Sequence, residues 1–263
     1  MGISFVTAMR SVAGPYRSNN EDAAAASPAF AIVADGVGGH AGGEVASGTV
    51  VRHLARALEG ADVAALDPDA LRALVAEAND ALRRQVAERP DLEGMATTLT
   101  ALVRGDGVLR VVHVGDSRAY RLHGDGERTG QRVTHDDSLV QELVDAGAIR
   151  AADAAHHPQR HVILRSLGGD AEDAGDVTVL EVPAVPGDRW LLCSDGLTDE
   201  LDDDELLAVA AAPGTAEDAA AALLAAALEA DAHDNVTVVV CDVVAEGEAG
   251  GPPALLGAAA PTD

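Results

Sequence analysis

Residues 31–47 read AIVADGVGGHAGGEVAS, and they place one carboxylate, Asp35, between an apolar run and a glycine-rich loop. The run Phe30–Ala34 is short and wholly apolar, which predicts a buried strand. Residues 44–58 carry apolar side chains at helical spacing, so a helix is expected after the loop. Two interpretations compete. Either the loop binds the phosphates of a nucleotide, or it turns the chain sharply and Asp35 is the functional residue.

The nucleotide interpretation rests on Gly36, Gly38 and Ala41, which fit the loose dinucleotide pattern G-x-G-x-x-G/A. Asp35 argues against it, because a carboxylate beside the pyrophosphate would repel it. The helix is also expected to start only at residue 44, too late for a third small residue to pack helix on strand. A nucleotide-dependent oxidoreductase therefore stays an alternative, and it would require a parallel sheet.

The composition limits the classes of partner. The chain has 263 residues and a formal net charge of −26, so we expect no nucleic-acid partner and no binding to anionic lipid. No apolar stretch reaches the roughly 18 residues of a membrane span. Cys193 and Cys241 lie in apolar runs, which predicts buried free thiols in a reducing, cytoplasmic compartment. We expect a monomer.

The order of strand and helix signals favours an α+β domain over residues 1–245. Several expected strands are joined by short turns, which is typical of antiparallel sheets, and the expected helices could cover them. Residues 149–176 lack periodicity and are interpreted as a surface excursion. Residues 246–263 are rich in Gly, Pro and Ala and are interpreted as a disordered tail. Further strands are expected at 98–104, 108–114, 118–122, 131–134, 177–182, 189–194 and 235–244, and further helices at 67–88, at 138–146 and after Thr215.

Four aspartates stand where an apolar strand begins or ends: Asp35, Asp116, Asp195 and Asp234. A single strand-end Asp is ordinarily a turn residue. Four of them in one chain favour an oxygen-rich pocket for hard cations such as Mg²⁺ or Mn²⁺.

Eight short motifs follow one another in an order that resembles a known family. With these motifs the chain resembles the PP2C-type, metal-dependent Ser/Thr protein phosphatases in their bacterial form, over residues 10–244. The resemblance implies a four-layer α-β-β-α sandwich of two antiparallel sheets flanked by helices. The motifs are RSNNED (17–22), ADGVGGHAGGEVAS (34–47), GMATTLTAL (94–102), VHVGDSRAYRL (112–122), VTHDDSLVQELVDAGAI (133–149), HVILRSLG (161–168), LLCSDGLTDEL (191–201) and HDNVTVVV (233–240).

The resemblance also implies a centre of two Mn²⁺ or Mg²⁺ ions, with a third, weaker ion beside it. Asp35 would bridge the pair, and the Gly36 carbonyl would bind one of its ions. Asp195 and Asp234 would complete the ligands of the other ion. Asp116 would help to hold the third ion, with Asp195 shared.

Further positions are carried over from the same motifs. Arg17 would grip the substrate phosphate and count with Asp35 and Asp195 as catalytic. Glu21 and Asp22 would reach the metals through water. His40 is a candidate general acid. Residues 149–176 would form a flap beside the site.

The implied reaction is hydrolysis of phosphoserine and phosphothreonine on proteins by a metal-bridged water or hydroxide, in opposition to a Ser/Thr protein kinase. A thiol-based phosphatase is disfavoured, because no Cys-x5-Arg loop is present. Two further alternatives are a non-enzymatic regulator of the same fold and a hydrolase of small phosphate esters. A zinc site at His156, His157 and His161 is the alternative for the flap.

Overall fold

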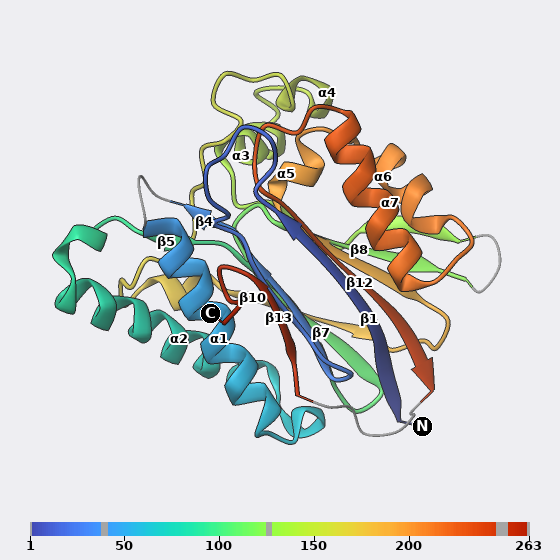
Figure 1. Cartoon of the computed structure of the whole chain (residues 1–263), viewed down its shortest axis with the longest axis horizontal. Coiled ribbons are helices and arrows are strands. Elements are labelled where there is room, and N and C mark those ends of the chain that lie inside the picture. The colour runs from blue at the N-terminus through green and yellow to red at the C-terminus, as the bar shows by residue number, and fades with distance from the viewer. Residues whose placement is uncertain (1, 38–41, 125–127, 246–251, 262–263) are drawn as a thin grey trace.

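The computed structural model describes residues 2–37, 42–124, 128–245 and 252–261. Two antiparallel sheets pack face to face, and helices cover both outer surfaces (Figure 1). The fold confirms the predicted α-β-β-α sandwich. Within the described residues, no helix has both the length and the apolar character needed to cross a membrane.

The first sheet has five strands in the order β1-β12-β11-β8-β9. Its longest pairing joins β1 and β12 from Ile3↔Ala245 to Val12↔Val236. The strand β1 was not among those predicted from the sequence. The strands are β1 (Ile3–Val12), β8 (Arg118–His123), β9 (Thr129–Arg132), β11 (Arg189–Cys193) and β12 (Val236–Ala245).

The second sheet has six strands in the order β10-β7-β6-β3-β2-β13. A separate two-stranded ribbon pairs β4 with β5, and β4 follows β3 directly after Asp35. The strands are β2 (Ala23–Ala26), β3 (Phe30–Ala34), β4 (Gly36–Val37), β5 (Ala96–Thr97), β6 (Leu99–Arg104), β7 (Val108–Val114), β10 (Thr178–Pro183) and β13 (Ala254–Gly257).

The helices start largely where the sequence provides caps. The Asp67 side chain accepts a hydrogen bond from the Ala70 amide, and Thr215 forms a capping box with Asp218. The first long helix instead begins at Gly42, two residues before the predicted start. The helices are α1 (Gly42–Glu59), α2 (Pro68–Glu88), α3 (Leu139–Asp145), α4 (Ala151–Ala154), α5 (Asp195–Thr198), α6 (Asp203–Ala211) and α7 (Ala216–Glu229), with short 3₁₀ turns η1 (Val63–Ala65), η2 (Pro90–Leu92) and η3 (Asp173–Asp176).

Three apolar cores separate the four layers. Because strand side chains alternate between faces, Phe30 and Ile32 of β3 pack in the core beneath α1 and α2, while Val33 packs between the sheets. On β11, Trp190 lies between the sheets and Leu191 faces the core under α6 and α7. Strands of both sheets are thus buried on both faces, so the strand ends that carry the aspartates are rigidly held.

The predicted disordered tail is wrong for the part of it that the structure describes, residues 252–261. Ala254–Gly257 form β13, which pairs antiparallel with β2, and Ala259 is completely buried. Gly257 makes the turn at φ +60°, after which the Ala258 amide donates to the Asp22 carbonyl at 2.7 Å. The physical reason is that β2 offers an unpaired edge, and the two leucines of β13 cover apolar cores on its two faces.

Removing this strand should destabilise the domain. A chain that ends at Ala245 exposes the β2 edge and the pocket of Ala259, at a cost of about 2 kcal/mol in the free energy of unfolding. The melting temperature should fall by about 4–8 °C in a calorimetric scan. A chain that ends at Pro261 is the control and should melt like the full chain. Equal melting temperatures for all three would contradict the role given to β13.

Candidate metal centre and active site

Asp35 stands where β3 ends and β4 begins, and its backbone is fixed by the neighbouring β5–β6 segment. The Asp35 amide donates to the Thr98 hydroxyl at 3.0 Å. The Asp35 carbonyl accepts from the Thr98 amide at 2.9 Å and from the Thr97 hydroxyl at 2.8 Å. Every polar backbone atom of Asp35 is therefore occupied, and only its carboxylate is available for chemistry.

The structure brings the four strand-end aspartates together from both sheets. Asp35 ends β3, Asp116 lies in the turn between β7 and β8, Asp195 begins α5 after β11, and Asp234 precedes β12. Asp35 and Asp195 lie close enough for each to shift the carboxyl pKa of the other. The negative charge of Asp195 raises the pKa of Asp116, and that of Asp234 raises the pKa of Asp195. These aspartates therefore influence one another electrostatically, and their role as metal ligands stays a prediction.

The cluster has strongly perturbed proton affinities when no cation is bound. Burial raises the pKa of Asp35 well above its usual range, and the negative charges of Asp22, Asp195 and Asp116 add to that rise. Burial likewise raises the pKa of Asp195 to about 6 and that of Asp22 to about 7. The pKa of Asp116 is also raised well above its usual range, mainly by burial and in addition by the negative charge of Asp195. Such a cluster holds protons unless a cation replaces them.

Three carboxylate oxygens of these aspartates lack a hydrogen-bond partner among the described residues. The Oδ1 atoms of Asp22, Asp116 and Asp195 are buried and have no hydrogen-bond partner among the described atoms. Buried polar atoms are nearly always satisfied, so each of these unpaired carboxylate oxygens needs an explanation. Mg²⁺ and Mn²⁺ prefer carboxylate oxygens, so the donor set suits them.

The acidic pair after Arg17 is held by residues that sequence reasoning did not single out. Ser194 Oγ donates to Asp22 Oδ2 at 2.7 Å, and Asp22 is completely buried. The Glu21 amide donates to Asn235 Oδ1 at 2.8 Å. Asn235 follows Asp234 directly and is buried. The sequence signal for it was a polar residue immediately before the apolar run of β12.

Arg17 reaches over the cluster from the loop after β1. Its side chain is half exposed, and Nη2 donates to Asp234 Oδ2 at 2.6 Å. Nε donates to the His233 carbonyl at 3.4 Å. The guanidinium is therefore anchored on one side and open to solvent on the other.

Two glycines allow the close approach at the start of α1. A side chain on Gly36 would collide with the carbonyls of Gly43 and Glu21, and one on Gly43 would collide with the Glu21 carboxylate. The glycines thus bring Asp35, Glu21 and the first turn of α1 into contact. His40, the candidate general acid, lies outside the described residues.

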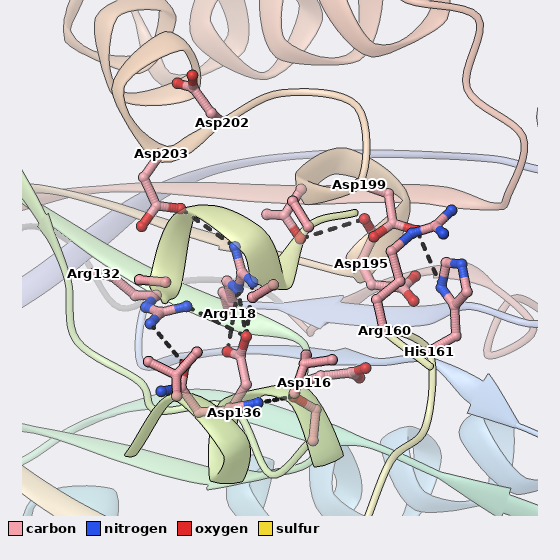
Figure 2. A pocket seen from close by; sticks show the side chains of 18 residues that line it. Asp116, Arg118, Arg132, Asp136, Arg160, His161, Asp195, Asp199, Asp202 and Asp203 are labelled. Carbon is pink, nitrogen blue, oxygen red and sulfur yellow. Dashed lines mark hydrogen bonds and ion pairs between the residues drawn. The ribbon is translucent and has the colours of Figure 1, made fainter. Parts of the chain in front are cut away.

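A cavity of about 360 Å³ opens beside Asp116 and Asp195 (Figure 2). On one wall Arg118 Nη2 donates to Asp136 Oδ2 at 2.7 Å, and Arg118 Nη1 donates to Asp203 Oδ1 at 3.3 Å. The excursion 149–176 contributes the other wall. That segment contains α4 and η3, so it is an irregular but anchored stretch.

Asp199, at the end of α5, also lines this cavity and was not identified in the sequence analysis. His161 Nδ1 lies 3.4 Å from Asp199 Oδ2, and ligand atoms of His161, Asp195 and Asp199 lie within 4.8 Å of one another. Asp199 is placed there by α5, because a residue four positions after Asp195 falls on the same side of a helical turn. That spacing was the available signal.

Neither cysteine can act as a nucleophile. Cys193 and Cys241 are free and completely buried, one in each of two neighbouring strands. Burial raises the pKa of the Cys193 thiol to about 12 and raises the pKa of Cys241 as well. The thiolate is the reactive form, so both thiols are inert at neutral pH.

Comparisons with known proteins identify the family of the chain. A family profile described as "Protein phosphatase 2C" matches residues 17–230. The chain is 46% identical over 240 residues to "Serine/threonine protein phosphatase PstP" of Mycobacterium tuberculosis, covering 90% of this chain and 45% of that protein. It thus spans about half the length of that relative.

A second relative and a solved structure are covered over most of their own length. The chain is 34% identical over 214 residues to "Serine/threonine phosphatase stp" of Listeria innocua, covering 80% of this chain and 83% of that protein. A solved structure of the PstP catalytic domain "in complex with 2 Manganese ions" aligns with a TM-score of 0.81 and 41% identity, over 92% of this chain and 99% of that one.

Proposed function

Because the chain belongs to the protein phosphatase 2C family, we propose that it hydrolyses phosphoserine and phosphothreonine in proteins with Mn²⁺ or Mg²⁺. One observation carries the proposal. Carboxyl groups from both sheets lie close enough to raise one another's pKa values, and three of their buried oxygens have no hydrogen-bond partner among the described residues. The names of the relatives as Ser/Thr phosphatases and the manganese in the PstP structure support it.

In this proposal the chain holds two ions and a weaker third. Asp35 would be held in common by the pair, the Gly36 carbonyl would contribute to one ion, and Asp195 with Asp234 would complete the other. Asp116 and Asp195 would hold the third ion. When bound, the ions supply an activated water and neutralise the charge that develops on the phosphoryl oxygens. Glu21 and Asp22 act from behind the ligands through water, and the Ser194 and Asn235 contacts keep their segment in place.

Arg17 supplies what the metals cannot, which is orientation of the phosphate. A phosphomonoester is a dianion, and the planar guanidinium can bind two of its oxygens at once. The His233 carbonyl and the Asp234 carboxylate accept hydrogen bonds from Nε and Nη2, which fixes one edge of the guanidinium beside the aspartates. The phosphate is thereby aligned for in-line attack by water. The reaction then needs no nucleophilic side chain that forms a covalent intermediate.

Replacing Arg17 should chiefly weaken substrate binding. With Arg17→Ala we expect KM for a phosphopeptide to rise about tenfold or more, because a charge-assisted pair of hydrogen bonds is lost. Arg17→Lys keeps the positive charge but loses the planar pair of donors, so its KM should lie between those of the wild type and Arg17→Ala. Steady-state kinetics at saturating Mn²⁺ measure this. An unchanged KM in Arg17→Ala would remove Arg17 from the phosphate site.

The proposed function is tested with peptides that differ only in the phosphorylated residue. We expect turnover of phosphoserine and phosphothreonine peptides with Mn²⁺, little with phosphotyrosine, and none with excess chelator. Turnover of p-nitrophenyl phosphate alone would instead favour a hydrolase of small phosphate esters. Turnover that survives the chelator would refute the metal-dependent mechanism.

We also propose that the substrates are products of a Ser/Thr protein kinase, and that the enzyme acts on them as a monomer in the cytoplasm. The two free, buried thiols support a reducing compartment. Sedimentation of the purified chain tests the monomer.

A further inference from the structure

One exposed aromatic residue stands beside the phosphate-binding arginine. The chain has only two Phe, two Tyr and one Trp. Phe5, Phe30, Tyr120 and Trp190 are all at most 3% exposed, whereas Tyr16 is 56% exposed. A single exposed apolar ring would need no explanation by itself. Its position next to Arg17 and its fixed geometry do need one.

The ring of Tyr16 is held rigidly against its neighbours. It stacks on the ring of His233 with a centroid distance of 4.4 Å and an interplanar angle of 3°. The Tyr16 hydroxyl donates to Asp231 Oδ1 at 2.9 Å. Asp231 has a φ of +69°, the only positive value at a non-glycine residue among those described. We call Tyr16, His233 and Asp231 the aromatic shelf.

The shelf is continuous with the proposed active site on both sides. Tyr16 immediately precedes Arg17, and His233 immediately precedes Asp234, while the His233 carbonyl accepts from Arg17 Nε. Neighbouring Cα atoms are about 3.8 Å apart, as are those of a bound peptide. A substrate residue within two or three positions of the phosphorylated one can therefore reach Tyr16 once the phosphate lies on Arg17.

The charges around the shelf select the kind of side chain that would bind. Asp231 holds the Tyr16 hydroxyl, and Glu200 Oε1 lies 3.8 Å from His233 Nδ1. His233 covers one face of the Tyr16 ring, so the exposed surface belongs to the other face and the edges. An aromatic face beside carboxylates is a site for a guanidinium or an ammonium group.

We propose that the aromatic shelf is a specificity site that binds an Arg or Lys side chain close in sequence to the phosphorylated residue. The inference rests on the proposed phosphatase function and deepens it, because it names the substrates that this active site prefers. Cation–π contact and the nearby carboxylates should raise kcat/KM about threefold to tenfold, mainly through a lower KM.

The test uses phosphoserine peptides in an Ala-based sequence, with a single Arg moved through the three positions on each side. The wild-type enzyme should prefer Arg at one or two of these positions over Ala there. In Tyr16→Ala the ratio of the two kcat/KM values should fall to about one. Tyr16→Phe, the matched control, keeps the ring and should keep most of the preference.

The design separates the shelf from the acidic surface as a whole. Tyr16→Ala changes no charge, so a preference due to the net charge of −26 would survive it and would be nearly equal at every position. A preference that persists in Tyr16→Ala, or that is absent from the wild type, overturns this inference alone. If the wild type hydrolyses none of the peptides with Mn²⁺, the proposed function fails, and the inference fails with it.

Discussion

Asp35→Asn should lower kcat on a phosphopeptide by about 1,000-fold or more while making the metal-free protein more stable. The substitution removes the carboxylate proposed to bridge both ions, and an amide oxygen is a poor replacement for it. It also removes a carboxyl group whose ionisation is opposed by burial and by Asp22, Asp116 and Asp195. The melting temperature without metal should rise, by about 2–4 °C for each kcal/mol regained.

The opposite directions of the two effects make this prediction specific. A variant that loses activity because it misfolds would also melt earlier. Kinetics with Mn²⁺ and calorimetry in chelator measure the two quantities on the same sample. Asp204→Asn, at an exposed acidic position in the first turn of α6, is the control and should change neither quantity much. An active Asp35→Asn variant would show that Asp35 is not the bridging ligand.

Mn²⁺ should stabilise the protein strongly at pH 7.5 and hardly at pH 5. The carboxyl pKa values of Asp35, Asp116, Asp195 and Asp22 are all raised in the folded metal-free state, to about 6 for Asp195 and about 7 for Asp22. The folded protein thus holds protons that the unfolded chain has released. These groups favour folding most below about pH 4, and that contribution is lost as the pH rises through their folded pKa values.

Metal binding reverses this loss, because ligands bind the ions in their ionised form. An ion at 100 times its dissociation constant adds about 2.7 kcal/mol. The Mn²⁺-induced rise in melting temperature should therefore be about 5 °C or more at pH 7.5 and should fall towards zero at pH 5. Asp35→Asn with Asp195→Asn should abolish the rise at pH 7.5. An equal rise at both pH values would mean that the stabilising ions bind elsewhere.

The sequence predicts those parts of the fold and site whose signals are local. Phe30–Ala34 is a compact apolar run, and the caps at Asp67 and Thr215 use side chains that bond their own helix starts. Asp35 could be singled out because a carboxylate before glycines conflicts with phosphate binding. The repeated strand-end Asp favoured a shared pocket, but the resemblance was needed to assign each aspartate a role, since no local signal relates β3 to α5.

The missed elements depend on partners far away in the chain. β2 reads AAAA, and alanine is depleted in strands, so only its position between β3 and β13 makes it one. β13 is stabilised by the edge of β2, more than 200 residues earlier in sequence. Asn235 matters because it bonds the Glu21 amide from the opposite end of the chain. Such pairings are tertiary, and composition or periodicity does not carry them.

The most direct test of the central claim, that these aspartates form a metal centre, is anomalous diffraction at the manganese edge from crystals grown with Mn²⁺. We expect two strong peaks with the Asp35 carboxylate between them, one of them also contacted by Asp195 and Asp234. A weaker third peak should lie beside Asp116. Absence of peaks at Asp35, or peaks that remain in Asp35→Asn, would contradict the account.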